Sequence, residues 1–370
     1  MKILCQKAHL LESIQIVQKA VSTKSTIPMI GGIYLSAKEG VLELQSNDYE
    51  TAIKCSLPVQ ILTSGTTVLA AKYFSEIVRK LPGDTIEISS SSENTMITLK
   101  SGKACYNLVC LPHADFPVVQ ILESNNTYEI PEKTFKNIIR QTTFACAHED
   151  TRPVFTGVLC EIENTKINMI ATNTHRLSFR TAEIINNTNC PLKVIIPSKI
   201  LNELNKILSS EMETNVSISC HQNKMAFNFR GIYMETQLIE GQFPNYNQVI
   251  PKNFKTEIII ETNALSEAVE RASLLTRDGD YNVIKMDVDN EKITVTSNNP
   301  EVGVGYEEAG AITTGEPITI AFNARYILDV LKIIDTPEIL FSFTSPLTPA
   351  TIKSKEQNEY MYVITPVRTN

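Results

Sequence analysis

VLELQSN, at residues 41–47, is a short alternation of apolar and polar residues that ends in a Ser-Asn pair. Alternation of this kind predicts a half-buried β-strand. The pattern returns as INMIATN at residues 167–173 and as ITVTSN at residues 293–298. The first residues of the three stretches are spaced by 126 positions both times, from 41 to 167 and from 167 to 293. This self-similarity predicts three copies of one structural unit in the 370-residue chain.

Helical patterns surround each of these strands. In the stretch before the first strand, Leu10, Ile14, Val17 and Val21 recur at the spacing of one helix face. The stretches that precede the three strands are 9–21, 134–146 and 264–276, and those that contain a second helix are 68–81, 194–208 and 318–334.

Strands and short turns fill the rest of each third. That order predicts an α+β fold, with two helices packed on an antiparallel sheet in each of three tandem repeats. We expect the domains to span residues 1–125, 126–252 and 253–370.

The distribution of charge says more than its total. Lys and Arg number 34 against 41 Asp and Glu, and this net charge of -7 by itself argues against a nucleic-acid partner. The helical windows nevertheless contain 13 bases and 7 acids. These helices either carry an ordinary solvated face or present a basic surface to a polyanion. The second interpretation predicts salt-sensitive, sequence-independent binding to duplex DNA. The windows are 7–20, 72–81, 132–146, 198–208, 263–276 and 323–334.

Several function classes find no support in the residues. The eight cysteines are scattered without a CxxC pair, which favours reduced, mostly buried thiols of a cytoplasmic protein over a zinc site. The N-terminus does not resemble a signal peptide, and no apolar run approaches the length of a membrane span. The absence of Trp disfavours stacking on single strands. We therefore expect no membrane, metal or cofactor.

Catalytic signatures are also missing. The chain contains no GxxxxGK[ST], HExxH or GxSxG motif. His175, within ATNTHRLSF, is the one histidine in a setting that suggests a general base, but no nucleophile with an orienting acid accompanies it. A turn residue, or one lining a protein-binding groove, is the favoured interpretation. Asp278 and Asp280 suggest a metal site only if further acids converge on them, and a surface loop is favoured.

Three motifs, in their order along the repeated chain, carry a family resemblance: ATNTHRL (171–177), EGQFPNY (240–246) and YVITPVR (362–368). With the basic helices, they resemble the bacterial sliding clamps, the beta subunits of replicative DNA polymerase III. The resemblance runs essentially from end to end. It implies a non-catalytic processivity factor that forms a head-to-tail homodimer, a ring of six domains with helices inside and sheets outside. The first domain of one chain would meet the third domain of the other.

Simple geometry agrees with two chains in such a ring. Six helices, each about 10 Å across, would enclose a hole of only ~9 Å, narrower than the ~12 Å major groove. Twelve helices give a hole of ~28 Å, enough for a duplex with a layer of water. A head-to-tail contact that closes after half a turn produces a ring rather than a fibre. The DNA contacts of a sliding ring are weak and non-specific.

The resemblance also implies two sets of site residues. A pocket between the second and third domains would take short linear peptides from the replicative polymerase, the clamp loader, other DNA polymerases and repair proteins, with His175 and Arg176 holding polar groups at its rim. Its lining would be Phe155, Thr172, Thr174, His175, Arg176, Leu177, Pro244, Val249, Val363, Thr365, Pro366, Val367 and Arg368. We expect DNA to be contacted by Lys24, Lys72, Arg79, Lys80, Lys136, Arg140, His148, Glu149, Lys199 and Lys206.

The sequence departs from the family pattern at four of these positions. Thr174 replaces a Gly or Ser, Thr365 and Val367 replace the methionines of some relatives, and Glu149 stands where Gln is common. The peptide preference is therefore expected to differ. Two alternatives stay open at this point: a DNA-processing enzyme, and a regulatory scaffold that binds peptides but not DNA.

Overall fold

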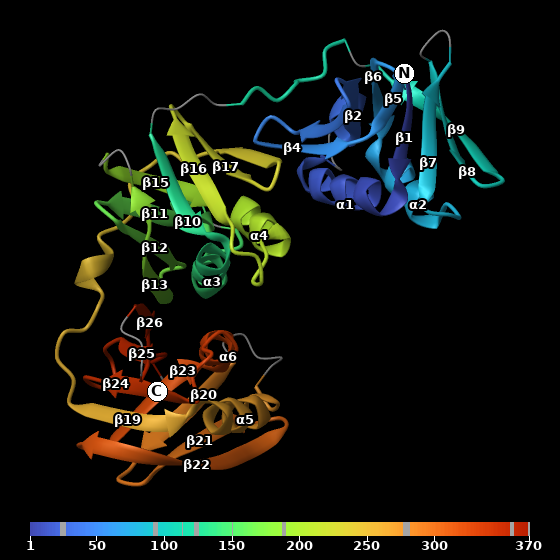
Figure 1. Ribbon diagram of the computed structural model, residues 1–370. Coiled ribbons are helices and arrows are strands. Elements are labelled where there is room, and N and C mark those ends of the chain that lie inside the picture. The colour runs from blue at the N-terminus through green and yellow to red at the C-terminus, as the bar shows by residue number, and fades with distance from the viewer. Residues whose placement is uncertain are drawn as a thin grey trace. The chain divides into compact units, whose positions relative to one another are not determined.

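A computed structural model describes residues 1–22, 27–91, 95–112, 114–121, 126–149, 151–186, 190–276, 282–355 and 359–368 (Figure 1). The chain divides into two compact units. The first comprises Met1–Glu132, Ile185–Thr188 and Lys206–Leu238, and the second comprises Lys133–Ile184, Asn189–Asn205 and Ile239–Asn370.

The first unit is built on one 14-stranded antiparallel sheet. Its strand order is β14-β10-β16-β17-β18-β4-β3-β2-β6-β9-β8-β7-β1-β5. The strands are β1 (Lys2–Gln6), β2 (Gly32–Lys38), β3 (Val41–Asn47), β4 (Thr51–Pro58), β5 (Gln60–Thr63), β6 (Gly65–Ala70), β7 (Thr85–Ser90), β8 (Met96–Ser101), β9 (Ala104–Leu111), β10 (Thr127–Pro131), β14 (Ile185–Asn186), β16 (Asn215–His221), β17 (Lys224–Phe229) and β18 (Ile232–Gln237).

The second unit is built on a 12-stranded antiparallel sheet with the order β15-β11-β12-β13-β26-β25-β24-β19-β22-β21-β20-β23. The strands are β11 (Gly157–Glu163), β12 (Lys166–Thr172), β13 (Arg176–Glu183), β15 (Leu192–Pro197), β19 (Thr256–Glu261), β20 (Val283–Val288), β21 (Lys292–Asn299), β22 (Gly303–Gly315), β23 (Ile318–Asn323), β24 (Glu338–Phe343), β25 (Ala350–Ser354) and β26 (Tyr360–Ile364). Every strand pair in both sheets is antiparallel, as the alternating patterns predict.

Each repeat contributes two helices, and each helix buries its apolar stripe. The helices are α1 (Lys7–Val17), α2 (Ala71–Lys80), α3 (Glu132–Thr143), α4 (Ser198–Ile207), α5 (Thr262–Ser273) and α6 (Ala324–Leu331). In α1, Leu10, Ile14 and Val17 are fully buried, because their spacing places them on one face. Figure 1 shows α5 and α6 side by side against the strands of the second unit, where they close an apolar core with β20 and β21.

Five of the six helices, all but α2, are shorter than their sequence windows. The pattern beginning at residue 7 continues to 20, but α1 ends at Val17 and a 3-10 turn covers Gln18–Ala20. Likewise α3 ends at Thr143, and α6 spans only Ala324–Leu331. Tighter i→i+3 turns at helix ends keep the apolar spacing while leaving the α-helix.

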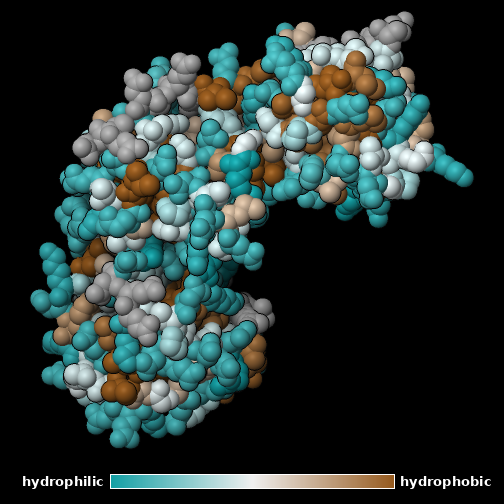
Figure 2. All heavy atoms as spheres, in the orientation of Figure 1, coloured by the Kyte–Doolittle hydropathy of each residue, from teal (hydrophilic) through white to brown (hydrophobic). Residues whose placement is uncertain are grey.

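Hydrophilic side chains are mostly at the surface, but the cysteines are only partly buried. Hydrophilic side chains cover most of the face shown in Figure 2. Of the eight free cysteines, only Cys5, Cys55, Cys146 and Cys160 are buried, so the expectation of mostly buried thiols holds for half of them. No helix in the described part of the chain is long and apolar enough to cross a membrane.

Candidate functional site

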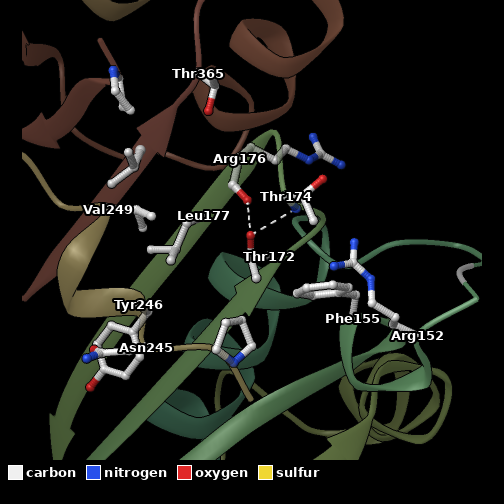
Figure 3. A pocket seen from close by; sticks show the side chains of 13 residues that line it. Arg152, Phe155, Thr172, Thr174, Arg176, Leu177, Asn245, Tyr246, Val249 and Thr365 are labelled. Carbon is white, nitrogen blue, oxygen red and sulfur yellow. Dashed lines mark hydrogen bonds between the residues drawn. The ribbon is translucent and has the colours of Figure 1, made fainter. Parts of the chain in front are cut away.

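A hollow of about 310 Å³ opens on the second unit beside the ladder between β13 and β26 (Figure 3). Leu177 and Val363 face each other in that ladder and form part of its floor. Nine of the thirteen residues predicted for the peptide pocket line this hollow: Phe155, Thr172, Thr174, Arg176, Leu177, Pro244, Val249, Val363 and Thr365.

A tightly held turn shapes one wall of the hollow. The Thr172 Oγ1 hydroxyl donates to the Arg176 carbonyl and accepts from the Thr174 amide. Asn173 Oδ1 accepts from the amides of His175 and Arg176. These bonds hold Thr174 at φ +76°, in the left-handed region that β-branched residues rarely adopt. The turn keeps a strained side chain on the pocket wall, and such strain clusters at functional sites.

Aromatic and apolar packing makes the walls rigid. Phe155 meets Phe243 edge to face, with ring centroids 6.5 Å apart. Leu159, Ile170 and Ile195 bury a small core beneath the hollow. A preformed apolar cavity with few polar groups is the usual form of a ligand or peptide site.

Four lining residues were missed by sequence reasoning: Arg152, Asn245, Tyr246 and Pro349. Asn245 and Tyr246 follow Pro244 within the EGQFPNY motif, so the motif itself was their signal. Arg152 places its guanidinium carbon 4.4 Å from the centre of the Phe155 ring. Pro349 comes from the turn between β24 and β25, and no local pattern pointed to it.

Tyr246 is tied to the sheet below it. Its hydroxyl donates to Glu161 Oε2 over 2.8 Å. Burial, together with this bond to a carboxylate, raises the pKa of the Tyr246 phenol to about 12. The hydrogen bond to Glu161 holds the Tyr246 side chain in place on the wall of the hollow.

Arg176 takes a position that its sequence context did not suggest. Its side chain is only 6% exposed, and Nη1 lies 2.5 Å from Asp329 Oδ2 on α6. Nη2 donates to the Phe144 carbonyl, and the guanidinium carbon stacks 4.6 Å from the centre of the Tyr326 ring. The guanidinium is thus buried against α6 and the Phe144 carbonyl, and does not lie at the pocket rim, where the resemblance placed it.

The other four predicted pocket residues lie near the hollow without lining it: His175, Pro366, Val367 and Arg368. The His175 ring stacks on Tyr326 with centroids 6.5 Å apart. The amide of Thr365 donates to the His175 carbonyl over 2.9 Å, and the amide of Val367 donates to the Ala321 carbonyl. These bonds anchor the C-terminal segment beside the pocket.

The predicted DNA-binding residues occupy several environments. In the first unit, Lys72, Arg79 and Lys80 lie on the exposed face of α2, opposite the buried Phe74 and Val78. In the second unit, His148, Glu149 and Lys199 are exposed and Lys136 is half-buried.

Three further positions complete this set. The exposed Lys206 belongs to α4. Arg140 on α3 forms an ion pair with Asp335, which lies in the segment that follows α6. The charge of Arg140 is therefore already compensated. Lys24 lies outside the described residues, as do Asp278 and Asp280.

Comparison with known proteins identifies the family. Models of the DNA polymerase III beta subunit match in all three of its domains: the N-terminal domain at residues 1–120, the central domain at 129–245 and the C-terminal domain at 247–368. The chain belongs to the DNA polymerase III beta subunit family. The α+β fold of three clamp domains and the role of a non-catalytic processivity factor of DNA polymerase, both predicted from the sequence, are thereby confirmed.

Individual relatives agree with this assignment. The beta sliding clamp of Bacillus subtilis is 37% identical over the full length of both chains, and that of Staphylococcus epidermidis is 34% identical over 95% of each. The crystal structure of the Bacillus subtilis DNA polymerase sliding clamp superposes with a TM-score of 0.96 at 36% identity over all of both chains. The beta subunit from Pseudomonas aeruginosa superposes with a TM-score of 0.94 at 26% identity, again over the full chains.

Proposed function

We propose that this beta subunit forms a ring-shaped homodimer that encircles duplex DNA and tethers partner proteins through the hollow beside β13 and β26. The partners would be the replicative polymerase, the clamp loader, other DNA polymerases and repair proteins, each offering a short linear motif. The cytoplasm is the proposed compartment, and 1–125, 126–252 and 253–370 are the proposed domains. One observation carries the ring: the way in which the repeats join.

Both joints between successive repeats use the same pair of strands. In each repeat, the strand after the Ser-Asn stretch is β4, β13 or β22, and the last strand is β9, β18 or β26. In the first unit, β4 of the first repeat pairs with β18 of the second. In the second unit, β13 of the second repeat pairs with β26 of the third. The rule leaves two strands without such a partner, β22 of the third repeat and β9 of the first.

On both β22 and β9, part of one edge is not paired with any described strand. Within the described part of the chain, residues 303–310 of β22 pair with β21 alone, because the pairing of β22 with β19 begins at Ala311. On β9, residues 104–109 pair with β8 and with no other described strand, and the pairing of β9 with β6 begins at Cys110. Unpaired edges of this kind are templates for pairing with another chain. A second copy supplies the missing partner twice, and two such joints close a ring.

The two joints within the chain also predict the register in which β22 would pair with β9 of a second copy. Ile53 pairs with Met234 in one joint, and Ser178 pairs with Tyr362 in the other. Gly305 holds the matching place in the third repeat, opposite the buried Ser297 in its own hairpin. Tyr106 holds the matching place on β9, opposite the buried Leu99. We therefore expect Gly305 to face Tyr106 of a second copy.

Exposed apolar side chains mark both edges. Val304 is 73% exposed and Tyr306 is 61% exposed on β22, and Leu274 at the end of α5 is 58% exposed. On β9, Tyr106 and Val109 are similarly uncovered. Clusters of apolar side chains on a free edge favour an interface over a solvated surface.

The exposed bases of α2 and α4 support a non-specific duplex contact. Lys72, Arg79 and Lys80 project from a helix whose opposite face packs on its sheet, as do Lys199 and Lys206 on α4. Lysine and arginine on helices attract phosphates without reading base edges, which permits sliding.

Topology gives the decisive experiment. The protein is loaded with its clamp loader onto nicked circular DNA, and the circle is then cut once. A ring should stay on the circle through gel filtration and slide off the linear product. Retention on linear DNA would indicate a DNA-processing enzyme or an ordinary side-on binder. A scaffold that binds peptides but not DNA would fail to load at all.

A further inference from the structure

A second hollow continues the first along the outer surface of the second unit. Its volume is about 300 Å³, and it lies between the chain segment Gln248–Asn253 and the turn that joins β24 to β25. Val249 and Pro349 line both hollows, so the two share a ridge. A chain segment seated in the first hollow can therefore pass over this ridge into the second.

Two hydrogen bonds connect the chain on either side of the second hollow and hold it in shape. The Thr344 hydroxyl donates to the Asn253 carbonyl over 2.6 Å, and the Lys255 amide donates to the Phe343 carbonyl over 2.9 Å. Pro251 and Pro349 restrict the two walls further. A groove that is fixed before binding spares the partner the cost of ordering it.

An exposed base lines each of the two hollows. Arg152 lies beside Phe155 on one side of the first hollow, and Val249 lies on the other side, as Figure 3 shows. Beyond Val249, the exposed Lys252 lines the second hollow. Neither hollow is lined by any Asp or Glu among the described residues. No ion pair of Lys252 occurs within the part of the chain that the structure describes.

We propose that the second hollow extends the partner site and takes an acidic flank of the partner segment, with Lys252 as the residue that selects it. Apolar side chains of the segment fill the first hollow, and the chain then crosses Val249 and Pro349. Its carboxylate meets the Lys252 ammonium at the far end. This inference rests on the proposed peptide-binding function of the first hollow, and it adds a second contact that distinguishes partners by charge.

Fluorescence anisotropy with matched synthetic peptides tests the proposal on the full chain. The parent peptide is short, carries Leu and Phe anchors and has no charge. Its derivatives add a Glu-Glu, Ser-Ser or Lys-Lys extension at either end. At low salt, Glu-Glu at one end should tighten binding by about two- to five-fold over Ser-Ser, and Lys-Lys there should weaken it. The gain should shrink as salt rises.

Charge reversal assigns the effect to its residue. Lys252→Glu should abolish the preference for Glu-Glu and favour Lys-Lys at that same end. Lys255→Glu is the matched control, since Lys255 is an exposed lysine of the same segment that lines neither hollow. Equal responses of the two variants would mean a general field effect and would overturn the assignment. If the parent peptide binds but Glu-Glu at neither end tightens binding, the second hollow does not extend the partner site. The proposed function of the first hollow is then unaffected. No binding of the parent peptide counts against the proposed function itself.

Discussion

Arg176 Nη1 and Asp329 Oδ2 lie 2.5 Å apart, and this ion pair connects the first residue of β13, which lines the hollow, to α6. The guanidinium also meets the Phe144 carbonyl and the rings of Phe144 and Tyr326. One residue of the pocket turn is thus a main link between two elements that are 153 positions apart in the chain.

Removing this link should destabilise the second unit. Arg176→Met deletes the ion pair, the bond to the Phe144 carbonyl and both ring contacts. We expect the free energy of unfolding, measured by urea titration, to fall by about 3 kcal/mol, as for other buried pairs that lose one partner. Arg271→Met is the control, because Arg271 forms its ion pairs with Glu267 and Glu307 in solvent. An equal loss in both variants would contradict the structural role of Arg176.

Thr174 should trade stability for peptide recognition. Thr174→Gly removes a side chain from a left-handed conformation at φ +76°. The relief should exceed the entropy cost of glycine and raise the free energy of unfolding by about 0.5–1 kcal/mol. Because the same side chain lines the hollow, affinity for the Leu and Phe peptide should change at the same time. Thr181→Gly, within strand β13, should instead destabilise the protein. A stabilised variant with unchanged peptide affinity would show that the Thr174 side chain does not contribute to peptide binding.

The floor of the hollow should carry much of the peptide affinity. Leu177→Ala deletes part of the apolar surface that pairs with Val363. We expect the Kd of the parent peptide to rise by about ten-fold or more, as for a central contact residue. Ile312→Ala, an exposed position on β22, is the control and should leave the Kd unchanged. Anisotropy measures both.

The free edge of β22 should control dimerisation. Val304→Asp places a charge on the part of β22 that pairs with β21 on one edge and with no described strand on the other, and desolvating the charge in an interface is costly. Sedimentation velocity should show a dimer dissociation constant at least ten-fold higher than that of the parent protein. Ile312→Asp lies on the same strand where β19 already pairs with it, and it should leave the dimer intact. A normal dimer in the Val304 variant would mean that the joint uses another surface.

Two buried thiols predict a loss of stability at alkaline pH. Burial raises the pKa of Cys5 and of Cys146 from about 9 to about 12. Both thiols ionise more readily in the unfolded chain, so their contribution is complete below about pH 9 and is lost as the pH rises towards 12. Urea midpoints should therefore fall above about pH 9, and less steeply in a Cys5→Ala, Cys146→Ala variant than in the parent.

Alkylation at neutral pH provides the corresponding test of exposure. Iodoacetamide should modify the exposed Cys105 first and spare Cys5 and Cys146 until the protein unfolds. Early modification of Cys146 would contradict its burial. Cys105→Ala removes the fast-reacting thiol and serves as the control.

Much of the fold is encoded locally. The alternation in VLELQSN and its two copies predicts strands, and the spacing of Leu10, Ile14 and Val17 predicts a buried helix face. Both patterns follow from the two- and 3.6-residue periods of the backbone, so they can be read without any partner. Repetition then gives three copies of one unit, and the motifs around His175 and Pro244 identify most of the pocket lining.

Tertiary structure alone decided which segments meet. The joints of β4 with β18 and of β13 with β26 depend on register between strands far apart in the chain, and no local period specifies that register. Pro349 reaches the hollow, and Arg176 turns away from its rim towards Asp329, for the same reason. The sequence by itself determined the repeated elements and their apolar faces, because these depend on neighbours within a few residues. The hollow, its charged ends and the two free edges required the folded chain, because they arise where distant elements leave a surface unfilled.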